Sequence, residues 1–136
     1  MRSRFRAALV LAVAGALSVS CGGIVDPSQN KVETFPGTIA VGGFGPVHPF
    51  SASKTGEISV KITALSPSSG TLVGIQWAQA SSAGACDGQV LQRTVAQLNI
   101  PAIANQIFSG NYCIQLFDAG YFSVAQTYML SVSHPP

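Results

Sequence analysis

Apolar and polar side chains alternate with a period of two along most of this chain. The clearest stretch is 57–65, in which Ile58, Val60 and Ile62 alternate with charged and hydroxyl-bearing residues. Because successive side chains of a β-strand point to opposite faces, this pattern predicts a strand with one buried face. The same alternation predicts five more strands, at 35–41, 48–53, 73–78, 112–117 and 127–132.

The segment 89–98 fits two structures. Its apolar residues recur at the spacing of a helix, but Thr94 and Val95 are β-branched and Pro101 soon interrupts the pattern. A single helix would have to pack outside a sandwich, so a strand is favoured, and a helix remains the alternative. Segments rich in Gly, Pro and Ser separate the elements and supply turns. The sequence therefore predicts an all-β domain over 32–134, a single antiparallel β-sandwich of seven to eight strands.

The start of the chain has a different pattern. Three arginines within the first six residues precede an apolar run at 7–19 and then a cysteine, Cys21. This layout predicts a signal peptide over 1–20. The apolar run is too short to cross a bilayer, which takes roughly 20 residues. Residues 21–31 are rich in Gly and polar residues, so they are expected to form a flexible tether.

The sequence LSVSC at 17–21 resembles the lipobox of bacterial lipoproteins, although Ser18 stands where that family usually has Leu. The resemblance implies that Cys21 is acylated and becomes the first residue of the mature protein. Lipid on Cys21 would hold the domain on a membrane. Gly22, in place of an Asp, implies the outer membrane or the cell surface. The expected location is therefore the cell envelope, with the domain lipid-anchored.

Charge argues against one class of partner. The chain has seven Lys and Arg and five Asp and Glu. Three of the basic residues lie in the leader, so four remain against five acidic residues, and the net charge of 21–136 is −1. Nucleic-acid binding relies on clustered Lys and Arg, and no such cluster is present in the sequence. Neutral polar residues must supply most of the surface, which suits an exported β domain.

Two cysteines, Cys86 and Cys113, remain once Cys21 is assigned to the lipid. Disulfides form readily in exported proteins and stabilise small domains, so these two are predicted to be bridged. The bridge would hold the loop before 89–98 against the strand at 112–117. Two buried free thiols are the alternative. Metal or redox chemistry is not expected, because a Cys-x-x-Cys spacing and a nearby His are lacking.

No motif for catalysis is found in the sequence. The two histidines, His48 and His134, are far apart in the chain, and no Gly-x-Ser-x-Gly motif accompanies them. The acidic residues are scattered, and Asp118 has the setting of a turn residue. The sequence therefore predicts no catalytic residue, no metal site and no cofactor, and indicates that the protein is not an enzyme.

Three aromatic residues, Phe117, Tyr121 and Phe122, cluster in and after the last turn. Phe117 takes the opposite face from Tyr112 in the strand at 112–117. If the three rings are exposed together they would form a patch for a partner, since large exposed apolar areas mark interaction sites. The alternative is that Phe117 packs under a loop or beside the disulfide.

The strands also resemble the bacterial pre-peptidase C-terminal family and related small jelly-roll sandwiches. The resemblance lies in VETFPGTI at 32–39, TGEISV at 55–60, SGNYCI at 109–114 and TYMLSV at 127–132. It implies a jelly-roll-like fold and an accessory role. The sequence thus favours a non-enzymatic envelope or surface lipoprotein whose sandwich is structural or binds a protein or glycan. The alternative is an accessory domain or subunit for a separately encoded secreted peptidase or glycosidase.

Overall fold

Eight strands and one short 3-10 helix make up a computed structural model of the chain, which describes residues 23–81 and 84–136. The predicted signal peptide and Cys21 lie outside the described residues. The helix is η1 (Pro27–Gln29), and the strands are β1 (Lys31–Ile39), β2 (Phe44–Ala52), β3 (Gly56–Ser66), β4 (Val73–Gln79), β5 (Val90–Ala96), β6 (Pro101–Ile107), β7 (Gly110–Phe117) and β8 (Gln126–His134). Within the described ranges, no helix is long and apolar enough to span a membrane.

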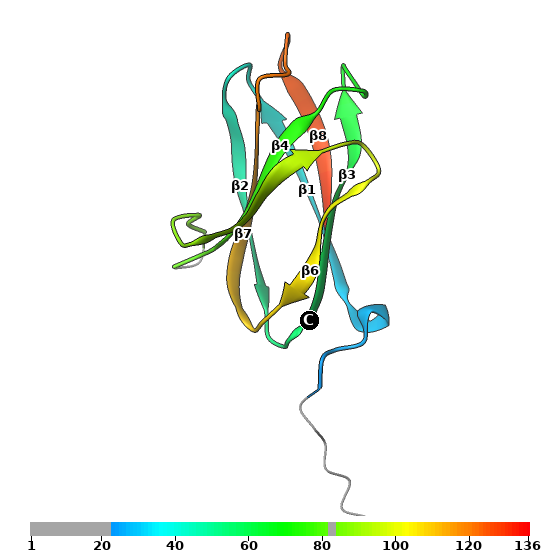
Figure 1. Ribbon diagram of the computed structural model, residues 1–136, viewed down its shortest axis with the longest axis vertical. Helices are drawn as coiled ribbons and strands as arrows, with labels where there is room; N and C mark the ends of the chain where they lie inside the picture. Colours follow the sequence, from blue (N-terminus) through cyan, green and yellow to red (C-terminus); the bar gives the residue numbers. More distant parts are fainter. Residues whose placement is uncertain (1–22, 82–83) are drawn as a thin grey trace, which may run out of the picture.

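The strands form two four-stranded antiparallel sheets packed face to face (Figure 1). Sheet I has the order β1-β8-β3-β6 and sheet II the order β2-β7-β4-β5. The pairs β1–β8, β2–β7, β3–β6 and β4–β5 are those of one long hairpin rolled into a sandwich. This nested pairing is the jelly-roll arrangement. The prediction of a single antiparallel, jelly-roll-like β-sandwich is therefore confirmed.

The core lies between the sheets and follows the predicted alternation. In β3 the inward side chains Ile58, Val60 and Ile62 are fully buried. From sheet II, Ile114 and Trp77 belong to the same apolar cluster. Burying a side chain of this size stabilises a fold by roughly 2 kcal/mol, so the alternate positions of eight strands hold the two sheets together.

The structure decides one open alternative and adds one strand. The strand favoured for the segment 89–98 over a helix is confirmed by β5. The strand at 101–107, β6, is not among those that alternation predicts. Its only fully buried side chains are Ile103 and Ile107, so alternation is weak there. Pro101 opens β6 because this strand is at an edge of sheet I, where a missing N–H costs no ladder bond.

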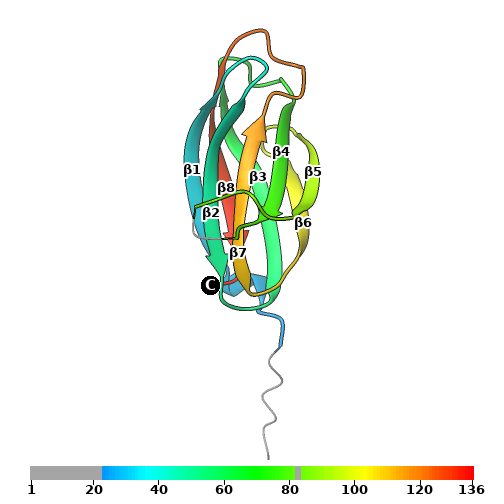
Figure 2. The ribbon, with the colours of Figure 1, turned by 90° about the vertical axis from the view of Figure 1, so that its left-hand side faces the viewer.

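The segment predicted to be a tether is partly packed against the domain. The Val25 amide donates a hydrogen bond to the Thr55 carbonyl at 2.9 Å. The Asn30 side chain donates to the Glu57 carbonyl, also at 2.9 Å. Asp26 caps the 3-10 helix through the Ser28 amide. Residues 25–30 therefore extend the lower end of the domain, as Figure 2 shows beneath the strands.

The predicted disulfide between Cys86 and Cys113 is confirmed, with the two Cα atoms 5.5 Å apart. Cys113 lies in β7, and its neighbours Tyr112 and Ile114 point into the core. Its side chain therefore lies on the outer face of sheet II. The bridge fastens the loop between β4 and β5 to that face.

Candidate functional site

The outer face of sheet I is polar. Thr34 of β1 pairs with Ser131 of β8, which also pairs with Lys61 of β3. The apolar exceptions are exposed Val32, Pro36 and Ala104 and half-buried Met129. Other outward side chains are Thr38, Ser59, Thr127 and Ser133. Thr127 donates to the Ser66 carbonyl and Ser133 accepts from Asn30. The other hydroxyl groups can bond to water, so this face is an ordinary solvated side of an antiparallel sheet.

The outer face of sheet II carries rings, aliphatic side chains and one cation. Figure 2 turns its four strands toward the viewer. One row across them consists of Phe44, Phe117, Gly74 and Val95. The next row consists of Val47, Gln115, Gln76 and Arg93. Phe44 and Val95 are 57% and 45% exposed. A run of exposed apolar groups on one face is typical of an interaction surface.

The side chain of Arg93, from the second row, reaches over a ring of the first row. The guanidinium carbon of Arg93 is 4.2 Å from the centre of the Phe117 ring. The ring of Phe44 is 5.5 Å from that of Phe117, centre to centre. A Cβ on Gly74 would collide with the Phe117 ring, so this ring lies flat against the backbone of β4. We call Phe44, Gly74, Arg93 and Phe117 the arginine stack.

The positive charge of Arg93 has no ion-pair partner among the described residues. In the described part of the chain the ion pairs are those of Glu33 with Lys31 and His134, and the side chain of Arg93 makes no hydrogen bond there. The attraction between a cation and an aromatic face fixes the plane of the guanidinium. Its N–H donors are thus oriented and open to solvent. Beside it, Gln76 donates weakly to Gln115, at 3.4 Å, and keeps its carbonyl oxygen open.

Two hollows in the surface lie away from the stack. The larger, about 660 Å³, is at the lower end between β3, β6 and the residues before β1, and Asn30 lines it. The Oδ1 atom of Asn30 is buried and has no hydrogen-bond partner among the described residues. The smaller hollow, about 350 Å³, lies beside Phe50 and Tyr112. None of the residues of the stack lines either hollow.

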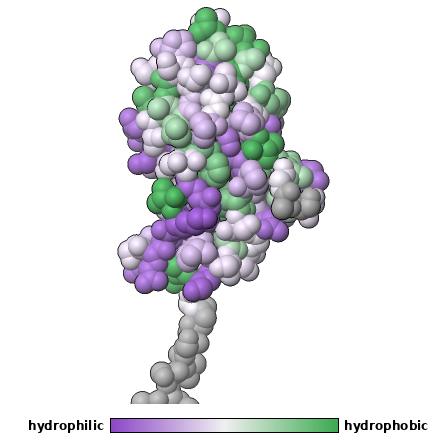
Figure 3. All heavy atoms as spheres, turned by 180° about the vertical axis from the view of Figure 1, so that it is seen from behind, coloured by the Kyte–Doolittle hydropathy of each residue, from purple (hydrophilic) through white to green (hydrophobic). Residues whose placement is uncertain are grey.

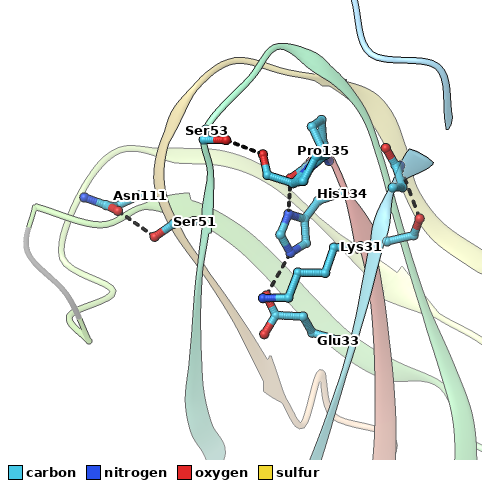
Figure 4. Close-up of polar contacts among 10 residues, drawn as sticks. Lys31, Glu33, Ser51, Ser53, Asn111, His134 and Pro135 are labelled. Atoms are coloured by element: carbon cyan, nitrogen blue, oxygen red, sulfur yellow. Dashed lines mark hydrogen bonds and ion pairs between the residues drawn. The ribbon is translucent and has the colours of Figure 1, made fainter.

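The most connected polar cluster is at the lower end, around His134 (Figure 4). This ring is fully buried, with Nδ1 2.7 Å from the Pro135 carbonyl oxygen and Nε2 3.0 Å from Glu33 Oε1. Lys31 also donates to that carboxylate, at 2.8 Å. Partial burial opposes the charge of Glu33, but the hydrogen bonds from Lys31 and His134 outweigh it and lower the pKa of the carboxyl group. Both nitrogens of His134 are occupied, so the cluster ties β1 to β8.

The second histidine is also engaged. His48 Nε2 lies 2.6 Å from the Tyr128 hydroxyl, and both side chains are buried. Burial lowers the pKa of His48 and raises the pKa of Tyr128 to about 12. The phenol therefore keeps its proton and donates a hydrogen bond to the neutral imidazole. A general base must reach its substrate, and the rings of His48 and His134 are both buried.

The predicted patch of three rings is not exposed as a unit. Tyr121 is 54% exposed, but Phe117 and Phe122 are buried to 7% and 8% exposure. Phe122 joins the core, and Phe117 lies under Arg93 rather than under a loop. The exposed ring that accompanies Phe117 is Phe44, from a strand far away in the sequence. Its partnership with Phe117 depends on strand register, which no local pattern indicates.

Asp118 is the turn residue that the sequence predicted. Its carboxylate accepts hydrogen bonds from the amides of Gly42, Gly120, Tyr121 and Phe122. These bonds, that from Gly42 being the strongest influence, lower the pKa of Asp118. They join two loops at the upper end. Among the described residues, no three His, Cys, Asp or Glu side chains gather into a metal-binding group.

No protein-family model matches this chain, and no curated protein matches it. The resemblances to bacterial lipoproteins and to the pre-peptidase C-terminal family therefore stay predictions. Since a jelly roll hosts many unrelated functions, the fold does not decide among them. The surface carries the information on function, because the two outer faces differ.

Proposed function

We propose that this protein is a non-enzymatic, lipid-anchored module of the cell envelope that binds its ligand through the outer face of sheet II. The observation that carries the proposal is the arginine stack: an oriented cation without an internal partner, beside the exposed ring of Phe44. Exposed apolar groups are normally covered in a working complex. The polar face of sheet I has no comparable feature.

The shape of the molecule suits such a role. The residues that follow the leader leave the sandwich at its lower end, and Phe44 opens β2 near the upper end (Figure 1). On the face that Figure 3 shows, hydrophilic residues are more frequent toward the lower end, although Ile24 and Val32 at that end are 63% and 61% exposed. A lipid on Cys21 would place the lower end at the membrane and hold the arginine stack away from it.

The two histidines support the non-enzymatic part of the proposal. His134 is fully buried with both ring nitrogens bonded, and His48 is bonded to Tyr128 inside the sandwich. Carboxylates that would assist catalysis are also engaged. Asp118 holds two loops together, and Asp87 accepts from the Ser81 hydroxyl. The polar groups that remain open on sheet II are suited to binding.

Thiol labelling tests the binding face even while the ligand is unidentified. Val95→Cys places a probe beside the stack, and Lys61→Cys places a matched probe on the outer face of sheet I. Each variant is labelled with a maleimide in opened envelope fractions and again after purification. We expect Val95→Cys to label more slowly in the envelope and Lys61→Cys to label equally in both. Equal labelling of Val95→Cys in both states would contradict the proposal.

The anchor has a separate test. Membrane fractionation and intact mass of the wild type are compared with those of Cys21→Ala. The wild type should remain with membranes and carry the added mass of acyl chains, whereas the variant should be released or retain its leader. An unchanged mass and unchanged membrane association in the variant would exclude the lipid anchor.

A further inference from the structure

We propose that the arginine stack binds an acidic polysaccharide, with Arg93 holding the carboxylate of a uronic acid unit. This inference rests on the proposed function, because it names the ligand of the same face. Three properties of the described residues lead to it: the open charge of Arg93, the exposed ring of Phe44 in the same stack, and the position of the stack across the face of a sheet.

The positive charge of Arg93 favours an anionic ligand. Arg93 is the only charged side chain in the two rows across sheet II, and no carboxylate of the described residues lies within ion-pairing distance of it. A guanidinium presents a planar fork of donors that matches the two oxygens of a carboxylate. Stacking on Phe117 fixes the fork before the ligand arrives, which reduces the entropy lost on binding.

The neighbours of Arg93 specify a sugar. Phe44, a member of the stack, is 57% exposed. The C–H face of a pyranose ring is apolar and carries slight positive charge, so it packs against the negative face of an aromatic ring. Gln76, which lies opposite Arg93 in β4, offers an open carbonyl oxygen that can accept a hydrogen bond from a hydroxyl group. A uronic acid combines these three features in one unit.

The position on the sheet favours a glycan over an acidic peptide. Phe117 and Gly74 lie on β7 and β4, which are the two central strands of sheet II. Arg93 and Phe44 come from the edge strands β5 and β2, but their side chains contact Phe117 over the face of the sheet. Extended peptides usually bind along a free strand edge or in a groove. The base of the stack is at neither, since the backbone of the central strands is already paired and both hollows lie elsewhere. A polysaccharide chain can instead lie flat across the side chains.

The experiment uses the exported full chain in detergent and isothermal titration calorimetry. The probes are polygalacturonate, alginate and hyaluronate, which differ in their sugars but share the carboxylate. Fully methyl-esterified polygalacturonate keeps the rings without the charge, and poly-glutamate presents the charge on a peptide. We expect at least one polyuronate to bind. If polygalacturonate binds, its ester should bind about tenfold more weakly, since charge-assisted hydrogen bonds are lost.

Variants locate the site. Arg93→Gln should weaken polyuronate binding about tenfold or more, and Arg93→Lys should weaken it less, because lysine keeps the charge but not the stacked fork. Phe44→Ala should weaken binding of the charged polymer and its ester by the same factor. Lys61→Gln is the matched control: it removes the same charge from the outer face of sheet I and should leave binding unchanged.

Three results would overturn the inference. They are the absence of binding to all three polyuronates, equal loss in Lys61→Gln and Arg93→Gln, and binding of poly-glutamate as tight as that of the polyuronates. The labelling of Val95→Cys separates this inference from the proposed function. Protection of that thiol in the envelope without polyuronate binding refutes the sugar alone. Absence of protection refutes the binding face itself.

Discussion

The outer faces of sheet I and sheet II cover the same apolar core, yet they present different chemistry to solvent. On sheet I, cross-strand neighbours such as Thr34, Ser131 and Lys61 are polar and separately solvated. On sheet II, Phe117 and Arg93 stack on each other, and a disulfide crosses the surface nearby. Burial of the core would allow two outer faces of the first kind. The second face therefore carries contacts that burial of the core does not require.

The largest effect should come from the disulfide, which belongs to sheet II. Replacing Cys86 and Cys113 by Ala removes a bridge across 27 residues. Closing a loop of that length stabilises the fold by about 3.5 kcal/mol on a chain-entropy basis. Urea unfolding should show a loss of that order. The control is Ser59→Ala with Ser131→Ala on sheet I, which should change stability by less than about 0.5 kcal/mol. Equal losses would remove the contrast between the faces.

The next effect concerns the glycine beneath the stack. Gly74→Val places side-chain atoms where the Phe117 ring lies, so the ring and Arg93 must move. We expect a loss of about 2 kcal/mol, as for other overpacked sites, together with loss of ligand binding. Gly70→Ala is the control, because a Cβ there meets no atom within 4 Å. Calorimetric melting measures the stability, and titration calorimetry measures the binding. An unperturbed Gly74→Val variant would show that the ring is not held against β4.

A smaller effect tests whether both faces belong to one cooperative unit. The bond between His48 of β2 and Tyr128 of β8 joins the two sheets. Tyr128→Phe leaves a buried imidazole nitrogen without its donor and should cost about 1 kcal/mol. Tryptophan fluorescence follows Trp77 of sheet II, and circular dichroism follows all strands. The two transitions should coincide in wild type and variant, and separate midpoints would mean that the sheets unfold independently.

The pH dependence of stability tests the same contact between His48 and Tyr128. Burial lowers the pKa of His48 below its ordinary 6.5. As the pH falls, the unfolded chain therefore binds a proton at His48 before the folded protein does. The contribution of the neutral imidazole to stability is complete above pH 6.5, and it declines as the pH falls from 6.5 toward the lowered pKa of the folded state. Urea midpoints between pH 8 and pH 5 measure the decline. His48→Gln should flatten it, and an equal slope in that variant would assign the decline to another group.

The smallest effect is expected on the outer face of sheet I. Lys61→Gln removes an exposed charge that makes no ion pair with a described residue. Such surface substitutions usually change stability by less than about 0.5 kcal/mol. Chemical denaturation should give midpoints within that range for the variant and the wild type. A larger loss would reveal an organised contact on sheet I and weaken the contrast with sheet II.

The sequence predicts the interior of this molecule better than its surface. Alternation located β3, because Ile58, Val60 and Ile62 each face the core. It did not identify β6, in which Asn105 stands between the two buried isoleucines. The cysteine count predicted the disulfide, since an exported chain leaves few other uses for the pair. These features depend on short segments or on composition, which a sequence displays directly.

The arginine stack shows why the candidate site could not be predicted from the sequence. The parity of Phe117 relative to Tyr112 correctly placed its ring on the opposite face. Its partners Phe44, Gly74 and Arg93 come from three other strands. A shift of one residue in the register of any of these strands would send its side chains to the other face. That register is set by the packing of the whole sandwich, and the local alternation of apolar and polar residues does not predict it.

The nested pairing of the strands also governs when this chain can fold. β8, formed by nine residues, lies between β1 and β3 in sheet I. Before β8 is in place, β1 lacks its partner in the sheet and β3 pairs only with β6. Contacts between distant parts of a chain form slowly. Refolding of this domain should therefore be slow, because sheet I is completed only when its first and last strands meet.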